Sequence, residues 1–239
     1  MIRIGVDVGG TNTDAVVMKG KKFLGGAKSP TTSDILTGVE NAIKSALSES
    51  NTSSDDVDVL IIGTTHFVNA LVQRTKLAQT GVIRMCLPSG SSILPFADWP
   101  NSLVSGMKGT YKLIKGGYEM TGGEISQLDH NELISAAREL RDMGCNQIAI
   151  SSVFATVRGD MEQEALEILT KEMPDLSITL SKSIGGMGLL ERENAAIINA
   201  SLRPLAAEVI DSFKLLQKSL DLSCPMFFTR NDGTLIEAK

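Results

Sequence analysis

The pattern of apolar and polar positions predicts a β-rich start to the chain. Apolar residues occupy every second position from Ile2 to Val8, which is typical of a half-buried strand, and Asp7 falls near its end on the opposite face. The order of predicted elements up to residue 90 is βββαβα followed by a further strand. The other elements expected in this part are strands over residues 15–18, 21–28, 57–62 and 81–87, and helices over residues 35–47 and 67–74.

The pattern after residue 90 predicts an α/β segment. Residues 88–128 are rich in Gly, Ser and Pro and have no clear period, so we expect an irregular excursion. Asp129 and Glu132 resemble a capping box, which predicts a helix ending at Gly144. Strands over residues 147–154 and 176–180 flank a helix over 160–173, a βαβ order that favours a parallel pair. The last expected elements are helices over residues 189–202 and 204–220, strands over 225–229 and 234–236, and a tight turn at 231–233.

Composition narrows the possible functions. The chain has 239 residues, enough for one large or two small domains, and a formal net charge of −5 without a run of Lys or Arg. We therefore expect no nucleic-acid partner. Three cysteines stand far apart, which indicates neither a zinc site nor a disulfide framework and favours a reduced, cytoplasmic setting. No apolar run reaches the length of a membrane helix, so no membrane segment is expected.

The stretch from Asp7 to Asp14 combines an acid with a small-residue turn. Gly9 and Gly10 let a ligand approach the backbone, and Thr11, Asn12 and Thr13 add hydrogen-bonding side chains. Successive N–H groups in such a turn form an anion nest. The stretch is no P-loop, because Thr11 stands where the lysine is required, and no Gly-x-Gly-x-x-Gly follows the strand. A phosphate-gripping hairpin remains, with an ordinary Gly-Gly hairpin as its structural alternative.

This strand-turn-strand arrangement resembles the first phosphate motif of the superfamily of actin, sugar kinases and heat-shock ATPases. The resemblance implies a ribonuclease-H-like (actin-like ATPase) lobe in an α/β fold with an additional βαβ segment. It further implies that ATP and Mg²⁺ are the cofactors. The acid at the position of Asp7 would then organise the magnesium ion through its water molecules.

Four segments together resemble the N-terminal part of the hydantoinase A and oxoprolinase family. They are residues 7–14, residues 63–74, the Gly-x-Glu-Ile segment at 122–129, and Arg192 with the helix up to Ala200; Asn12, His66 and Val68 depart from the usual residues. The family includes ATP-dependent hydantoin and 5-oxoproline ring-opening enzymes and acetone carboxylase subunits. The resemblance implies an N-terminal domain over 1–183, split into 1–90 and 91–183, and the start of a second domain over 184–239.

The family's second phosphate motif and its adenosine-binding segment are expected beyond Lys239, so we expect a truncated chain that lacks ATPase activity by itself. The resemblance implies an ATP-dependent hydrolase that opens a cyclic amide, with a second hydantoinase subunit and a homo- or hetero-oligomeric assembly as possible partners. A small-molecule kinase of the same superfamily, an ATP-dependent carboxylase subunit and a non-catalytic fragment that binds a partner remain as alternatives.

The candidate site residues fall in two segments. Asp7 is the expected magnesium-organising and catalytic acid, and Asp14 orders the turn or contacts another lobe. His66 has the protonation range of a general base, although a lone histidine is more often structural. Thr65 caps the following helix in the structural alternative. The expected phosphate contacts are Gly9, Gly10, Thr11, Asn12, Thr13, Thr64 and Thr65, and the expected cleft residues are Asn69 and Arg74, of which only one is expected to face the cleft.

Overall fold

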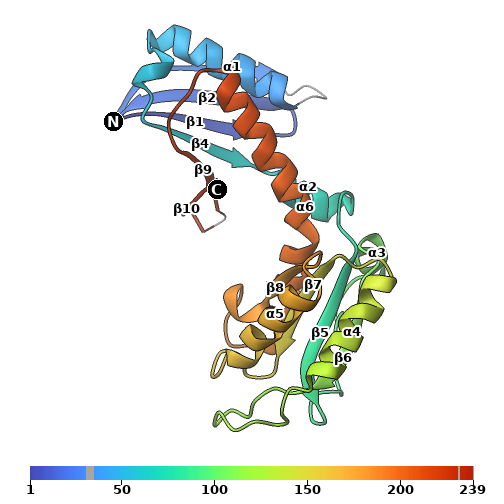
Figure 1. Cartoon of the computed structure of the whole chain (residues 1–239). Coiled ribbons are helices and arrows are strands. Elements are labelled where there is room, and N and C mark those ends of the chain that lie inside the picture. Colours follow the sequence, from blue (N-terminus) through green and yellow to red (C-terminus); the bar gives the residue numbers. More distant parts are fainter. Residues whose placement is uncertain (31–34, 231, 239) are drawn as a thin grey trace. The chain divides into compact units, whose positions relative to one another are not determined.

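A computed structural model describes residues 1–30, 35–230 and 232–238 of the chain (Figure 1). The chain forms two compact units. The first consists of Met1–Asn69 together with Ala206–Lys239, and the second of Ala70–Leu205. In the described part of the chain, no helix has the length and apolar character needed to cross a membrane.

The first unit is built on a six-stranded mixed sheet. Strands β1 to β3 form an antiparallel meander, β4 runs parallel to β1, and β9 runs parallel to β4. This arrangement confirms the predicted ribonuclease-H-like lobe. In sheet order the strands are β10 (Leu235–Glu237), β9 (Met226–Thr229), β4 (Val59–Thr64), β1 (Ile2–Val8), β2 (Asn12–Lys19) and β3 (Lys22–Pro30).

In the part of the chain that the structure describes, helices cover one face of this sheet. Helix α1 (Ile35–Ser50) buries Val39, Ile43 and Ala46 against the apolar positions of β1, which alternate as the sequence predicts. The last part of α6 (Leu189–Ser219) adds Phe213 and Leu216 to the same core. Because side chains alternate along a strand, Asp7 lies on the face away from this core. A single 3₁₀ turn, Ser54–Asp56, precedes β4.

The second unit is a parallel four-stranded sheet between two helical layers. Its strands, in sheet order, are β6 (Thr110–Lys115), β5 (Thr80–Leu87), β7 (Gln147–Ser152) and β8 (Ser177–Leu180). Helices α4 (His130–Asp142) and α5 (Asp160–Glu172) pack on Ile83 and Ile150. The first part of α6 packs on Val82 and Ala149 from the other side, beside the segment that contains α3 (Asn101–Gly106).

The capping box at the start of α4 is partly confirmed. The Asp129 carboxylate accepts hydrogen bonds from the backbone N–H groups of Asn131 (2.9 Å) and Glu132 (3.1 Å), so the aspartate is the N-cap. The Glu132 side chain accepts a hydrogen bond from Lys115 N instead of closing back on the cap. The start of the helix is therefore fixed by the aspartate alone and tied to β6.

Two predictions differ from the structure. Residues 110–115 form β6 inside the segment expected to be irregular, because pairing with β5 stabilises a strand that its own pattern does not show. One helix, α6, replaces the two predicted around Pro204; apolar contacts on both sides of the proline outweigh the roughly 3 kcal/mol that a proline costs inside a helix. The family domains expected over residues 1–183 and 184–239 stay a prediction, because the two compact units describe packing alone. Asn231 of the predicted turn lies outside the described residues.

Candidate functional site

The β1–β2 hairpin forms the tight glycine turn that the sequence predicts. Gly9 N donates a hydrogen bond to Asn12 O at 3.0 Å. A Cβ atom at position 9 would lie 2.8 Å from that same oxygen, so the turn excludes any side chain there. A Cβ atom at position 10 would meet nothing within 4 Å. Gly9 is therefore required by the turn itself, whereas Gly10 leaves open space above the backbone.

Asp7 lies in a row of residues across the exposed face of the first sheet. The strand registers place Asp14 on β2 and Gly63 on β4 on either side of it. This row borders a pocket of about 370 Å³. A Cβ atom at position 63 would lie 3.3 Å from Asp7 Oδ1 and 3.4 Å from Thr229 Oγ1, so the glycine leaves room beside the carboxylate. The pocket is lined by Gly5, Val6, Asp7, Asp14, Val16, Ile61, Gly63 and Thr229.

The two acids of the pocket differ in their contacts. Asp14 forms an ion pair with Lys28 of β3, with Nζ and Oδ1 3.4 Å apart. Asp7 is exposed, and among the residues that the structure describes its carboxylate has no hydrogen bond or ion pair. Asp7 is thus the acid whose charge is available to a ligand, and Asp14 is tied to the neighbouring strand.

The second predicted segment begins helix α2 (His66–Gln73), directly after β4. Thr64 pairs with Val8, the residue before the glycine turn, so β4 brings Thr64 and Thr65 to the same end of the sheet. Thr64 Oγ1 accepts a hydrogen bond from His66 N at 3.2 Å. Asn69 Nδ2 donates to Thr65 Oγ1 at 3.3 Å, which links two candidate residues along the helix.

Two other predicted residues, Thr13 and Arg74, have different surroundings. Thr13 is fully buried on the helix-covered side of the sheet, with Ala15 and Val17, so its side chain does not line the pocket. Arg74 follows α2 in the second unit with a positive φ of 55° and an exposed side chain. The structure therefore groups Asp7, Gly9, Gly10, Thr11, Asn12, Thr64 and Thr65 at one sheet end, and the start of α2 with His66 and Asn69 next to them.

The sequence did not identify Gly63 and Thr229 as pocket residues. Gly63 is the first residue of the Gly-Thr-Thr turn. Its lack of a side chain is the sequence feature that could have indicated space for a ligand at this position. Thr229 lies on β9, which pairs with β4 although more than 150 residues separate the two strands in sequence. No local sequence pattern predicts such a contact. Within the described ranges, no group of three or more His, Cys, Asp or Glu side chains is placed to hold a metal ion.

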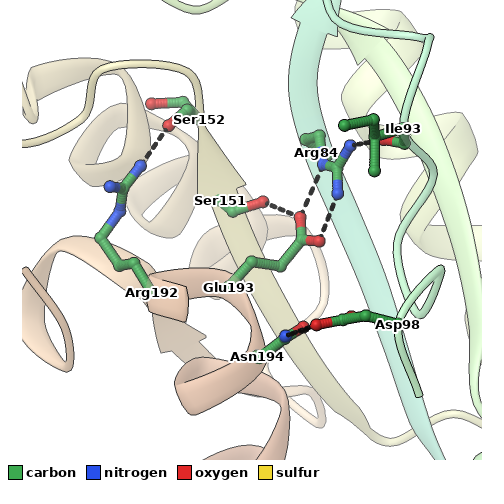
Figure 2. A network of polar contacts seen from close by, with 8 residues as sticks. All are labelled: Arg84, Ile93, Asp98, Ser151, Ser152, Arg192, Glu193 and Asn194. Carbon is green, nitrogen blue, oxygen red and sulfur yellow. Dashed lines mark hydrogen bonds and ion pairs between the residues drawn. The ribbon is translucent and has the colours of Figure 1, made fainter. Parts of the chain in front are cut away.

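The second unit contains a network of buried charges that the sequence did not predict (Figure 2). Arg84 of β5 and Glu193 of α6 form an ion pair, with Nε donating to Oε2 at 2.7 Å, and both side chains are at most 1% exposed. Ser151 of β7 donates to the same carboxylate at 2.6 Å. Because Arg84 and Ser151 lie on the sheet face that α6 covers, Glu193 reaches both.

The neighbouring residue Arg192 extends the network from α6 to the end of β7 and, through Ser181, to α5. Its guanidinium donates to Ser152 O at 2.7 Å and to three backbone carbonyls of the loop that precedes α6. Its Nε donates to Ser181 Oγ at 2.9 Å, and Ser181 donates to Glu162 of α5 at 2.6 Å. Burial raises the pKa of Glu162 and lowers the pKa of Arg192. This network joins β7, α5 and α6.

The comparisons with known proteins assign the chain to a family. The model of the hydantoinase/oxoprolinase N-terminal region matches residues 3–173, so the chain belongs to this family. Caprolactamase subunit alpha of Pseudomonas jessenii is 24% identical over 251 residues, an alignment covering 98% of the chain and 36% of that protein.

Two solved structures share the fold. The crystal structure of the ATP-dependent caprolactamase from Pseudomonas jessenii has a TM-score of 0.78 at 22% identity, covering 98% of this chain and 36% of that one. A nucleotide-free acetone carboxylase also has a TM-score of 0.78, at 17% identity, covering all of this chain and 37% of that one. The chain thus spans little more than a third of the length of these relatives.

Proposed function

We propose that the first unit is the nucleotide-binding part of an ATP-dependent enzyme that opens the C–N bond of a cyclic amide. The observation that carries this proposal is the exposed carboxylate of Asp7 at the end of β1, which has no polar partner among the described residues and lies beside an open pocket and a glycine turn. Membership of the hydantoinase/oxoprolinase family supports it, as does the similarity to a caprolactamase subunit.

The residues at this sheet end suit magnesium and phosphate. Mg²⁺ commonly keeps several water molecules and takes only one or two protein carboxylates, and Asp7 is such a carboxylate. The turn at Gly9 and Gly10 offers backbone N–H groups, with Thr11 and Asn12 beside them, and Thr64 and Thr65 border the same sheet end. Bound Mg-ATP would supply the phosphoryl group that makes an amide carbon a better target for water. His66 would act as a general base, and Asn69 would face the cleft.

The assembly follows from the same relationship. The matched relative is a subunit alpha, so we expect this protein to work with a second hydantoinase-type subunit in a homo- or hetero-oligomer. A cytoplasmic location belongs to the same proposal. An ATP-dependent carboxylase subunit is the second candidate, because the fold matches acetone carboxylase with the same TM-score as caprolactamase.

Substitution of Asp7 by asparagine in the native protein tests the proposal. Asp7→Asn removes the charge that would organise magnesium and keeps the size of the side chain, so magnesium-dependent ATP turnover is expected to fall by about 100-fold or more. Because the Asp7 carboxylate forms no hydrogen bond or ion pair with the described residues, the melting temperature is expected to stay unchanged.

Asp55→Asn is the matched control. Asp55 is another exposed aspartate of the first unit, it lies outside the pocket, and its substitution should leave turnover intact. ATP turnover by Asp7→Asn at the rate of the native protein would remove Asp7 from the site and with it the proposed function.

A further inference from the structure

The second unit has a pocket of its own at the carboxyl ends of its parallel strands. Its volume is about 320 Å³, near the lower limit for small-molecule sites. Every residue that borders it belongs to the second unit, so it is independent of the pocket at Asp7. The lining residues are Arg84 of β5, Ser89, Gly90, Ser92 and Ile93 of the loop that follows β5, and Leu189 and Leu190 at the start of α6.

The topology of the sheet points to this position. Strand β5 comes first in the second unit, and the next two strands, β6 and β7, lie on opposite sides of it. The chain runs from β5 to β6 on one side and then crosses to β7 on the other, so the position between β5 and β7 is a topological switch point. In open parallel sheets, ligands bind outside the carboxyl ends of the strands at such a switch point. The Arg84–Glu193–Ser151 cluster bridges β5 and β7 there (Figure 2).

The loop after β5 is folded back tightly to form one wall. Gly90 N donates to Cys86 O at 2.7 Å, and a Cβ atom at position 90 would lie 2.6 Å from Cys86 Cβ. No residue with a side chain fits at this point without moving the loop. The close approach of Gly90 thus fixes where the loop leaves the strand, and it sets Ser92 and Ile93 at the pocket.

The chemistry of the lining selects the kind of ligand. Arg84 is 1% exposed, and its guanidinium donates to Glu193 through Nε and Nη2 and to Ile93 O through Nη1. A guanidinium has five N–H donors, so two donors stay unused among the described residues. Glu193 already balances the positive charge, and Ile93, Leu189 and Leu190 make the walls apolar. An anion would lose its hydration there without gaining a net positive partner.

We propose that this pocket binds an uncharged small molecule that has one carbonyl acceptor and an apolar body. The carbonyl oxygen would accept a hydrogen bond from a free N–H of Arg84, and the body would pack on Ile93, Leu189 and Leu190. The site extends beyond the proposed nucleotide-binding function and does not depend on it.

Titration of the 239-residue chain with 2-piperidone, a neutral lactam, tests this proposal without any nucleotide. The methyl resonances of isoleucine and leucine are followed by NMR. We expect saturable shifts for Ile93, Leu189 and Leu190, with Kd on the order of millimolar for a ligand of this size. Cyclopentanecarboxylate, an anion of similar size, should shift the same resonances at least tenfold less effectively.

Two variants fill the pocket, and one controls for the substitution itself. Leu190→Trp and the surface substitution Ser92→Phe are each expected to weaken 2-piperidone binding at least tenfold. Leu215→Trp makes the same exchange at an exposed position of α6 outside the pocket and should leave binding unchanged. Equal binding by Ser92→Phe, stronger binding of the carboxylate, or no saturation at concentrations tenfold above the expected Kd would each overturn the proposal.

Discussion

The two units use charged side chains in opposite ways. In the second unit, Arg84, Arg192 and Glu193 are at most 1% exposed, and each has hydrogen-bond partners on other elements. In the first unit, Asp7 is exposed and has no partner among the described residues. A charge enters a folded interior only when it is paired, so the buried charges report on how the second unit is held together. Asp7 lies beside a pocket without a partner among the described residues, which supports the proposed ligand site in the first unit.

The glycines of the two units also have different roles. Gly90 packs against Cys86 in the second unit and shapes a loop. Gly63 leaves space beside Asp7, and Gly10 leaves open space above the hairpin turn. The space beside Asp7 fills no need of the folded chain that the described residues show, so these glycines support the proposed binding role.

The largest effect on stability is expected from breaking the buried ion pair. Arg84→Leu leaves Glu193 charged and buried, and is expected to destabilise the second unit by about 3–5 kcal/mol. Urea unfolding followed by tryptophan fluorescence measures this, because Trp99, the single tryptophan, belongs to the second unit and packs edge-on against Phe96.

A double variant sharpens this prediction. Arg84→Met combined with Glu193→Leu removes both charges and should restore most of the lost stability. Arg138→Leu, at an exposed position of α4, controls for the loss of an arginine. If Arg84→Leu unfolds at the urea concentration of the wild type, the buried pair does not hold the unit together.

A smaller effect is expected at the glycine turn, where two adjacent residues should behave differently. Gly9→Ala places a Cβ atom 2.8 Å from Asn12 O and is expected to cost about 1–3 kcal/mol. Gly10→Ala meets open space, and neither glycine has a positive φ, so the second variant should be as stable as the wild type or slightly more so.

Hydrogen exchange of the β1 and β2 amides measures the stability of the hairpin in both variants. The effect on ligand binding is measured as nucleotide affinity. This affinity should be lower in Gly10→Ala than in the wild type, because the new methyl group occupies the approach to the turn. A stable Gly10→Ala variant with unchanged nucleotide affinity would contradict the role of the turn in phosphate binding.

The smallest effect is expected from pH. Burial raises the pKa of Glu162 above its ordinary value of 4.5, so the folded state holds this proton more tightly than the unfolded state. The contribution of Glu162 to stability is therefore full below pH 4.5 and is lost as the pH rises through the folded pKa. As the pH rises from 4.5 through the folded pKa of Glu162, the wild type should lose stability relative to Glu162→Gln.

Urea unfolding from pH 4 upward, followed by the fluorescence of Trp99, gives the free energy of unfolding of both proteins. The test is how the difference between the two free energies changes with pH. Glu167→Gln, at an exposed position of the same helix, is the matched control for the amide substitution. A wild type that gains stability relative to Glu162→Gln as the pH rises would show that the neighbouring Arg192 outweighs burial at this carboxylate.

Local patterns predicted much of the fold and part of the site. The alternation in β1 fixed which face carries Asp7, and Asp129 marked the N-cap of α4 with bonds to Asn131 N and Glu132 N. Residues of the glycine turn and of the Gly-Thr-Thr segment were both expected to contact phosphate, and the register between β1 and β4 brings them to one sheet end. These features depend on residues close in sequence or on the period of a single element.

Features that depend on distant residues could not be predicted. Arg84 stands in an apolar strand, and no local pattern marks Glu193, 109 residues away on a predicted helix, as its partner. Strand β6 exists because β5 pairs with it, and α6 continues through Pro204 because it packs on both sides of the proline. Pairing and burial across such separations override local propensity.

Phosphate release by the native protein with Mg-ATP tests the central claim most directly. Release is measured with Mg-ATP as the only addition and again after a candidate substrate is added: hydantoins, 5-oxoproline, or ketones plus bicarbonate. Both measurements are made on the wild type and on Asp7→Asn. The account predicts release that a cyclic amide stimulates in the wild type and that is lost in Asp7→Asn. Equal release by the two proteins, or no stimulation by any cyclic amide, would contradict it.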